Sequence, residues 1–109
     1  RGFVVQEAGH SAEGRPLHRA SWGQGRTRVL LWSQMHGDES TATMALTDLF
    51  RFLGEHPQHP IVQRLRAATT LHFLPLMNPD GAIRFQRRSA QGIDINRDAR
   101  ALASPEAQP

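Results

Sequence analysis

A chain of 109 residues is long enough for one modest domain and too short for a large enzyme core. Its 13 basic residues, all arginines, are scattered and face 10 acidic residues, so the net charge of +3 gives little support to a nucleic-acid-binding surface. The absence of cysteine excludes disulfides and thiolate metal ligands, and no apolar run approaches the roughly 20 residues of a membrane span. We expect neither a nucleic-acid nor a membrane partner.

The N-terminal region predicts a β-hairpin at the edge of a sheet. Residues 3–6 and 17–22 have the composition of short strands, and the glycine and proline within residues 12–16 favour a turn between them. The continuously apolar run that follows, residues 28–34, is typical of a strand buried on both faces. This strand leads directly into His36.

A helix and a further strand come next. Apolar residues recur at helical spacing from Ser40 to Gly54, where Ser40 or Asp38 can cap the start and Gly54 can close the end. Residues 61–67 favour a second short helix, and residues 69–74 favour a buried strand. The order strand, helix, strand indicates a right-handed crossover. We therefore expect an α/β fold: part of a mixed, largely parallel sheet flanked by helices.

Polar clusters stand where the predicted strands end. His36 and Glu39 are separated by two residues in a glycine-containing turn, so an imidazole nitrogen and a carboxylate can point at one cation, and this donor set suits zinc. Further on, Asn96 and Arg97 supply hydrogen-bond donors that suit a substrate carboxylate. Open α/β sheets place their sites beyond the carboxyl ends of strands, which favours a functional interpretation.

Each cluster also has an ordinary interpretation when taken alone. His36 and Glu39 can be a polar loop residue and a residue favoured by the helix dipole, while residues 78–81, with the sequence Asn-Pro-Asp-Gly, form a typical turn. Arg87 and its neighbour can be a solvated face. The functional hypothesis depends on the ordered combination of a metal pair, a tight turn, an arginine and a carboxylate-binding pair.

That combination resembles the zinc metallocarboxypeptidases, relatives of carboxypeptidase A and of bacterial murein-peptide amidases, over residues 28–98. The family's H-x-x-E motif corresponds to His36 and Glu39, its N-P-D-G turn to residues 78–81, and its R-x-N-x-x-G-x-D-x-N-R segment to residues 87–97. The resemblance implies zinc on His36 and Glu39. It also implies that Arg87 polarises the scissile carbonyl, with Arg88 in that role if the correspondence shifts by one position.

By the same resemblance, Asn96 and Arg97 would hold the terminal carboxylate of a peptide or amidated substrate. The sequence departs from the family at Ser89, where asparagine is frequent, and at residues 98–99, which read Asp-Ala instead of asparagine followed by an aromatic residue. These departures leave the side-chain specificity unassigned.

The family's second zinc histidine and its general-base glutamate come well after the Asn-Arg pair. No histidine follows His72, which we expect to be packed or hydrogen-bonded within its strand, and the only later glutamate is Glu106. None of the other histidines is assigned to zinc. We expect residues 1–109 to form a single, incomplete catalytic domain, the N-terminal portion of a hydrolase, which is inactive by itself.

Two alternatives stay open. A zinc deacylase similar to aspartoacylase or succinylglutamate desuccinylase shares the metal pair, although the aspartate and glycine of residues 78–81 favour the peptidase. A non-catalytic module that binds carboxylates or peptides is the other. A sheet with an unpaired strand edge and an uncovered apolar face also favours self-association.

Overall fold

The computed structural model describes residues 2–108. The elements, in chain order, are β1 (Phe3–His10), β2 (Pro16–Gly23), β3 (Thr27–Trp32), α1 (Thr41–Glu55), α2 (Pro60–Ala68), β4 (Thr69–Leu74) and α3 (Pro79–Arg84), followed by short 3₁₀ turns at Ile95–Arg97 and Pro105–Ala107. In the described part of the chain, no helix is long and apolar enough to cross a membrane.

The four strands form one sheet in the order β1-β2-β4-β3. The β1–β2 hairpin and the β2–β4 pair are antiparallel, while β3 and β4 pair in parallel across the connection that carries α1 and α2. The mixed sheet, the flanking helices and the N-terminal hairpin are confirmed. β4 lies between β2 and β3. Of the three pairings within these four strands, the β3–β4 pairing is parallel and the other two are antiparallel.

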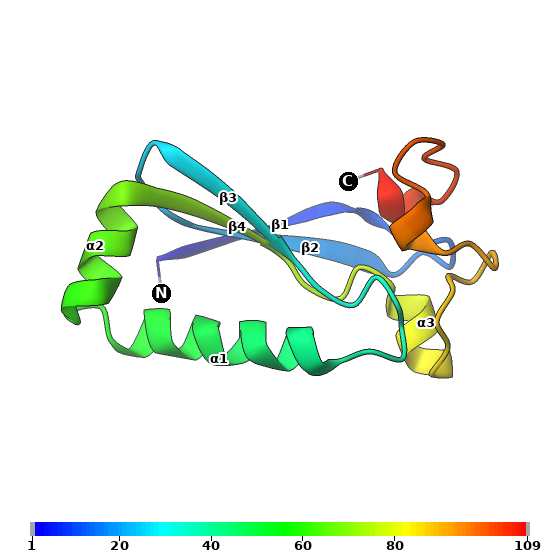
Figure 1. The fold of residues 1–109 in the computed structure, drawn as a ribbon, viewed down its shortest axis with the longest axis horizontal. Coiled ribbons are helices and arrows are strands. Elements are labelled where there is room, and N and C mark those ends of the chain that lie inside the picture. The colour runs from blue at the N-terminus through cyan, green and yellow to red at the C-terminus, as the bar shows by residue number, and fades with distance from the viewer. Residues whose placement is uncertain (1, 109) are drawn as a thin grey trace.

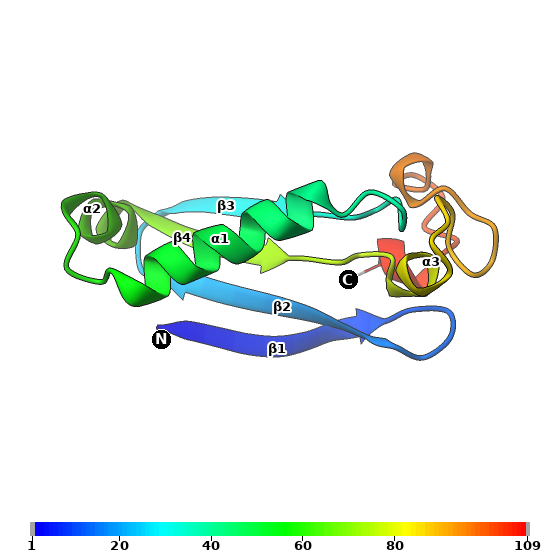
Figure 2. The ribbon, with the colours of Figure 1, turned by 90° about the horizontal axis from the view of Figure 1, so that it is seen from below.

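Helix α1 lies along one face of the sheet, and α2 packs at the end of the sheet from which β4 starts (Figures 1 and 2). The core fills the space between α1, α2 and this face, and its buried members are Ala20, Trp22, Leu46, Leu53, Val62, Leu71 and Phe73. On the opposite face, Leu30 and Trp32 remain about half exposed, at 53% and 50%. The described residues therefore leave this part of the opposite face uncovered, whereas Leu74 at the end of β4 is buried in a second, smaller cluster with Met77 and Ile95.

The helix ends differ from the predictions in two places. Ser40 is the N-cap of α1 but makes no side-chain capping bond, and α1 continues through Gly54 to Glu55. Residues 78–81 are the start of α3 rather than an isolated turn: Asn78 caps the helix by accepting a hydrogen bond from the Gly81 amide at 2.9 Å. Pro79 favours a helix here because its fixed φ suits the first helical position. The Asn78 side chain provides the cap by accepting from the Gly81 amide, which would otherwise have no partner within the helix.

β3 and β4 run in parallel toward the same end of the molecule, where α3 and the C-terminal segment lie (Figure 1). The pairing of the two strands continues into the loops, since the backbone N–H of Asn78 donates to the backbone carbonyl of Gln34 at 3.0 Å. Gln34 and Leu76 both adopt a left-handed backbone, with φ of 57° and 55°, and so turn the two loops sharply. The loop after β3 carries His36 and Glu39, and the loop after β4 carries Asn78.

Two histidines outside this region have local roles. His72 hydrogen-bonds through Nδ1 to the Ser21 hydroxyl at 2.9 Å, which confirms that it is a hydrogen-bonded strand residue. His59 caps α2 by accepting from the Ile61 amide at 3.1 Å.

Candidate metal and oxyanion site

His36 and Glu39 lie together in the loop between β3 and α1. His36 Nδ1 is 2.9 Å from Glu39 Oε2, and the imidazole is largely enclosed, with 13% of its side chain exposed, whereas the Glu39 carboxylate is 62% exposed. The Gln34 side chain braces the loop by donating to the Gly37 carbonyl at 2.9 Å. The turn therefore brings the two predicted ligand atoms side by side at the surface.

Asp94 holds the other side of the His36 ring, a contact that sequence reasoning missed. Asp94 Oδ1 is 3.0 Å from His36 Nε2, although 58 residues separate the two in sequence. Asp94 occurs in the segment compared with the family, but only the fold shows that it faces His36. Burial alone would raise the pKa of Asp94, but the hydrogen bond with His36 and the charge of Arg87 outweigh that effect and hold its pKa below the usual range.

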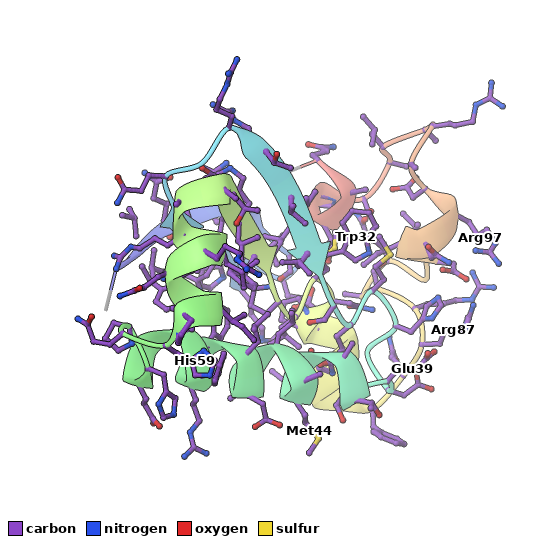
Figure 3. All side chains as sticks on the ribbon, turned by 60° about the vertical axis from the view of Figure 1, so that its left-hand side comes forward. Trp32, Glu39, Met44, His59, Arg87 and Arg97 are labelled. Atoms are coloured by element: carbon purple, nitrogen blue, oxygen red, sulfur yellow. The ribbon has the colours of Figure 1, made fainter. Side chains whose placement is uncertain are left out.

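Arg87 completes the cluster. Its Nε and Nη2 donate to Asp94 Oδ2 at 3.3 and 3.2 Å, and its Nη1 lies 3.5 Å from Glu39 Oε2. Arg88 instead donates to the Gly92 carbonyl at 3.3 Å. The structure thus places Arg87, rather than its neighbour, beside the His36–Glu39 pair, and Glu39 and Arg87 lie at the same end of the molecule in Figure 3.

Asn96 and Arg97 occupy different surroundings. Both belong to the 3₁₀ turn, whose start is capped by Asp94 accepting from the Asn96 amide at 3.1 Å. Asn96 lines a surface cavity together with His36 and Glu39, between the end of β3 and the start of α1. Arg97 lines a separate hollow beside Arg88 and Asp94. The structure therefore brings Asn96, but not the side chain of Arg97, to the cavity lined by His36 and Glu39.

The donor set fits part of a zinc site. An imidazole and a carboxylate are ordinary zinc ligands, and a catalytic site uses three protein ligands and leaves one position open. Within residues 2–108, no group of three or more histidine, aspartate or glutamate side chains is placed to hold a metal. Glu106 is buried beside the hairpin, where it accepts from the Ala12 amide at 3.1 Å, and takes no part in this cluster.

Comparison with known proteins identifies the family and the fold of this chain. The family model described as zinc carboxypeptidase matches residues 3–105. The metallo-carboxypeptidase from Burkholderia cenocepacia is 30% identical, with a TM-score of 0.88, over 97% of this chain and 31% of that one. The metallo-carboxypeptidase from Pseudomonas aeruginosa, in complex with (2-guanidinoethylmercapto)succinic acid, is 27% identical, with a TM-score of 0.83, over 94% and 30% of the two chains.

Among curated proteins, carboxypeptidase SOL1 from Arabidopsis thaliana is 32% identical over 65 residues, which are 59% of this chain and 13% of that protein. A Shewanella frigidimarina protein described as a putative succinylglutamate desuccinylase/aspartoacylase shares the fold, with 18% identity and a TM-score of 0.60 over 89% of this chain and 27% of that one. The chain therefore spans about a third or less of the length of these proteins.

Proposed function

This chain belongs to the zinc carboxypeptidase family, and from that premise we propose that it is the N-terminal portion of a zinc-dependent hydrolase that cleaves a peptide or amide bond next to a C-terminal carboxylate. The observation that carries the proposal is the joined cluster of His36, Glu39 and Arg87, in which an imidazole, a carboxylate and a guanidinium meet at one edge of the sheet. Residues 1–109 would be one incomplete catalytic domain.

His36 and Glu39 would hold the zinc ion. When bound, zinc would supply Lewis-acid polarisation of the scissile carbonyl and would lower the pKa of a water ligand toward about 7. Asp94 Oδ1, which lies 3.0 Å from His36 Nε2, would accept a hydrogen bond from that nitrogen and so leave Nδ1, the nitrogen beside Glu39, to bind zinc. The contact with Asp94 is partly buried and would hold the orientation of the ring.

Arg87 would stabilise negative charge on the carbonyl oxygen as the bond is attacked. A guanidinium donates in a fixed planar array and keeps its charge at any physiological pH, so it suits a developing oxyanion. Asn96, on the wall of the same cavity, would donate to the substrate carboxylate. Arg97 would join it bidentately once its exposed side chain rotates toward the cavity.

The third zinc ligand and the general base would come from polypeptide outside residues 1–109. In this proposal the 109-residue chain alone binds zinc weakly and turns over nothing. Its exposed β3 edge and the half-exposed Leu30 and Trp32 would also make the isolated chain self-associate, which light scattering measures directly.

The second candidate is a zinc deacylase, which the shared fold of the Shewanella frigidimarina protein favours. The test is to assay the full-length protein on short peptides with a free C-terminal carboxylate, on the same peptides amidated at the C-terminus, and on N-acyl amino acids. The carboxypeptidase proposal predicts cleavage of the free peptides, strongly reduced cleavage of the amidated ones and little deacylation. Deacylation without peptide cleavage would favour the second candidate, and no turnover of any substrate would favour a non-catalytic binding module.

A further inference from the structure

The Asn78 side chain lies completely buried among three segments that come from different parts of the chain. Its Oδ1 accepts from the Gly81 amide at 2.9 Å, and its Nδ2 donates to the Met35 and Arg87 carbonyls, both at 3.2 Å. A side-chain amide has two N–H donors, and here each faces one carbonyl oxygen. The reversed amide would press its own oxygen against both carbonyls, so these contacts fix the orientation.

Both carbonyls belong to the candidate site. Met35 immediately precedes His36, and the Arg87 carbonyl is also bound by the Gly37 amide at 3.3 Å. The loop and α3 touch backbone to backbone, because a Cβ at Gly37 would lie 2.2 Å from the Gly81 carbonyl carbon. Asn78 therefore links the loop of the metal pair to the backbone of the arginine beside it.

The side-chain contacts of Arg87 act on its guanidinium, which also donates to Asp94, the partner of His36, whereas Asn78 acts on the Arg87 backbone. Arg87 is 46% exposed, and its contact with Glu39 is long, at 3.5 Å, so the ion pair is solvated and contributes little. The Asn78 side chain, in contrast, is completely buried: it binds the Met35 carbonyl and shares the Arg87 carbonyl with the Gly37 amide, so its loss removes a donor from both carbonyls. The brace through Asn78 thus holds the Arg87 backbone against the His36 loop, while Asp94 joins the two side chains.

We propose that Asn78 is a positioning residue that sets the distance between Arg87 and the His36–Glu39 pair. The inference rests on the proposed function for the roles of these three residues, while the brace itself rests only on the buried hydrogen bonds. Asn78 touches no reacting group, and it acts on catalysis through Arg87.

Asp80, the second residue of α3, offers a matched control. It is also completely buried, and its Oδ1 accepts from the Ser11 hydroxyl and from Arg15 Nη1, both at 2.7 Å. These bonds attach the outer side of α3 to the β1–β2 hairpin, away from the metal pair. Asp80→Asn should therefore destabilise the fold without moving Arg87.

The test in the full-length protein is a double-mutant cycle of Asn78→Ser with Arg87→Ala. Serine is a good N-cap but is too short to reach the Met35 and Arg87 carbonyls. We expect kcat to fall about 100-fold with little change in KM, because a displacement of about 1 Å near the reacting atoms has that effect. In the Arg87→Ala background, the further loss should be less than about threefold.

Asp80→Asn should lower the midpoint of thermal unfolding but leave kcat close to that of the unchanged protein. An equal loss of kcat from Asn78→Ser in both backgrounds, or no loss in either, would overturn the proposal. Asn78→Asp repeats the cycle if the serine variant does not fold: it keeps the cap and the size, but places a carboxylate oxygen against both carbonyls.

Hydrogen exchange at the Gly37 amide tests the brace without any catalysis. Asn78→Ser should speed exchange at Gly37 by about tenfold or more, while a central β4 amide such as that of Leu71 stays protected. Unchanged exchange at Gly37 would overturn the proposal even in an active enzyme. If the full-length protein cleaves no peptide but Gly37 exchange accelerates, the positioning role stands and the proposed function fails.

Discussion

Replacement of Gly37 by alanine should disable the site through a backbone clash. A Cβ at this position would lie 2.2 Å from the Gly81 carbonyl carbon and 2.5 Å from both the Ala82 nitrogen and the Gln86 oxygen. All three atoms belong to the backbone, so no side-chain rotation relieves the contact. Ordinary contact begins at 3.4 Å, so the loop and α3 must separate by about 1.2 Å, the difference between 3.4 and 2.2 Å.

That displacement predicts two effects of similar origin. Forcing a methyl group into a packed interface costs about 1–3 kcal/mol of the free energy of unfolding. Because Gly37 is adjacent to His36 and its amide binds the Arg87 carbonyl, the same shift moves the metal pair relative to Arg87. A misplacement of about 1 Å lowers the rate about 100-fold, so kcat/KM of the full-length variant should fall by that factor.

The assay combines chemical denaturation with peptide hydrolysis for three glycine variants. Gly25→Ala makes an equally severe clash, 1.9 Å from the Ala68 carbonyl carbon, but at the opposite end of β3 and β4, so it should cost stability without a comparable loss of kcat/KM. Gly54→Ala lies in α1 with its nearest neighbour 4.0 Å away and should stabilise the protein by about 0.5–1 kcal/mol. Wild-type kcat/KM in Gly37→Ala, or an equal loss in Gly25→Ala, would refute the reasoning.

Three further predictions concern individual side chains. Arg87→Ala should lower kcat of the full-length protein by about 10²–10³-fold, measured on a peptide with a free C-terminal carboxylate, because it removes the charge beside the developing oxyanion; an unchanged kcat would contradict this role. Asp94→Asn should weaken zinc binding about 10–100-fold in a chelator competition, since His36 loses its carboxylate partner, and equal affinity would show that the ring is held by other contacts. Hydrogen bonds from the Ser104 hydroxyl and amide and from the Ala103 amide lower the pKa of Asp98 in the folded protein. The ionised Asp98 carboxylate therefore contributes fully to stability above the unfolded-state pKa of about 3.9, and this contribution is lost as the pH falls through the lower pKa of the folded state. Acid titration monitored by tryptophan fluorescence should therefore show a smaller loss of stability below about pH 4 in Asp98→Asn than in the wild type, and identical acid sensitivity would contradict the assignment.

Much of the fold could be predicted because its patterns are local. Helix α1 follows from apolar residues at helical spacing, and β3 from a continuous apolar run. The position of β4 between β2 and β3 could not be read from these patterns, because strand pairing depends on contacts between distant segments. The start of α3 was missed for a related reason. Asn-Pro-Asp-Gly is typical of a turn, and Asn78 caps a helix here because the chain stays helical to Arg84.

The candidate site divides in the same way. His36 and Glu39 are close in sequence, so their proximity follows from one turn. Asp94 meets His36 across 58 residues, and Asn78 reaches Met35 across 43, so the sequence alone indicates neither contact. Arg97 shows that closeness in sequence can also mislead: it directly follows Asn96, yet the two side chains line different cavities.

The zinc content of the purified full-length protein, compared with that of its His36→Ala variant, tests the central claim most directly. Both proteins are dialysed against the same buffer and measured by elemental analysis, with thermal unfolding as the control for folding. We predict about one zinc ion per wild-type chain and loss of that zinc in the folded variant. A wild-type protein without zinc, or a variant that retains it, would contradict the account.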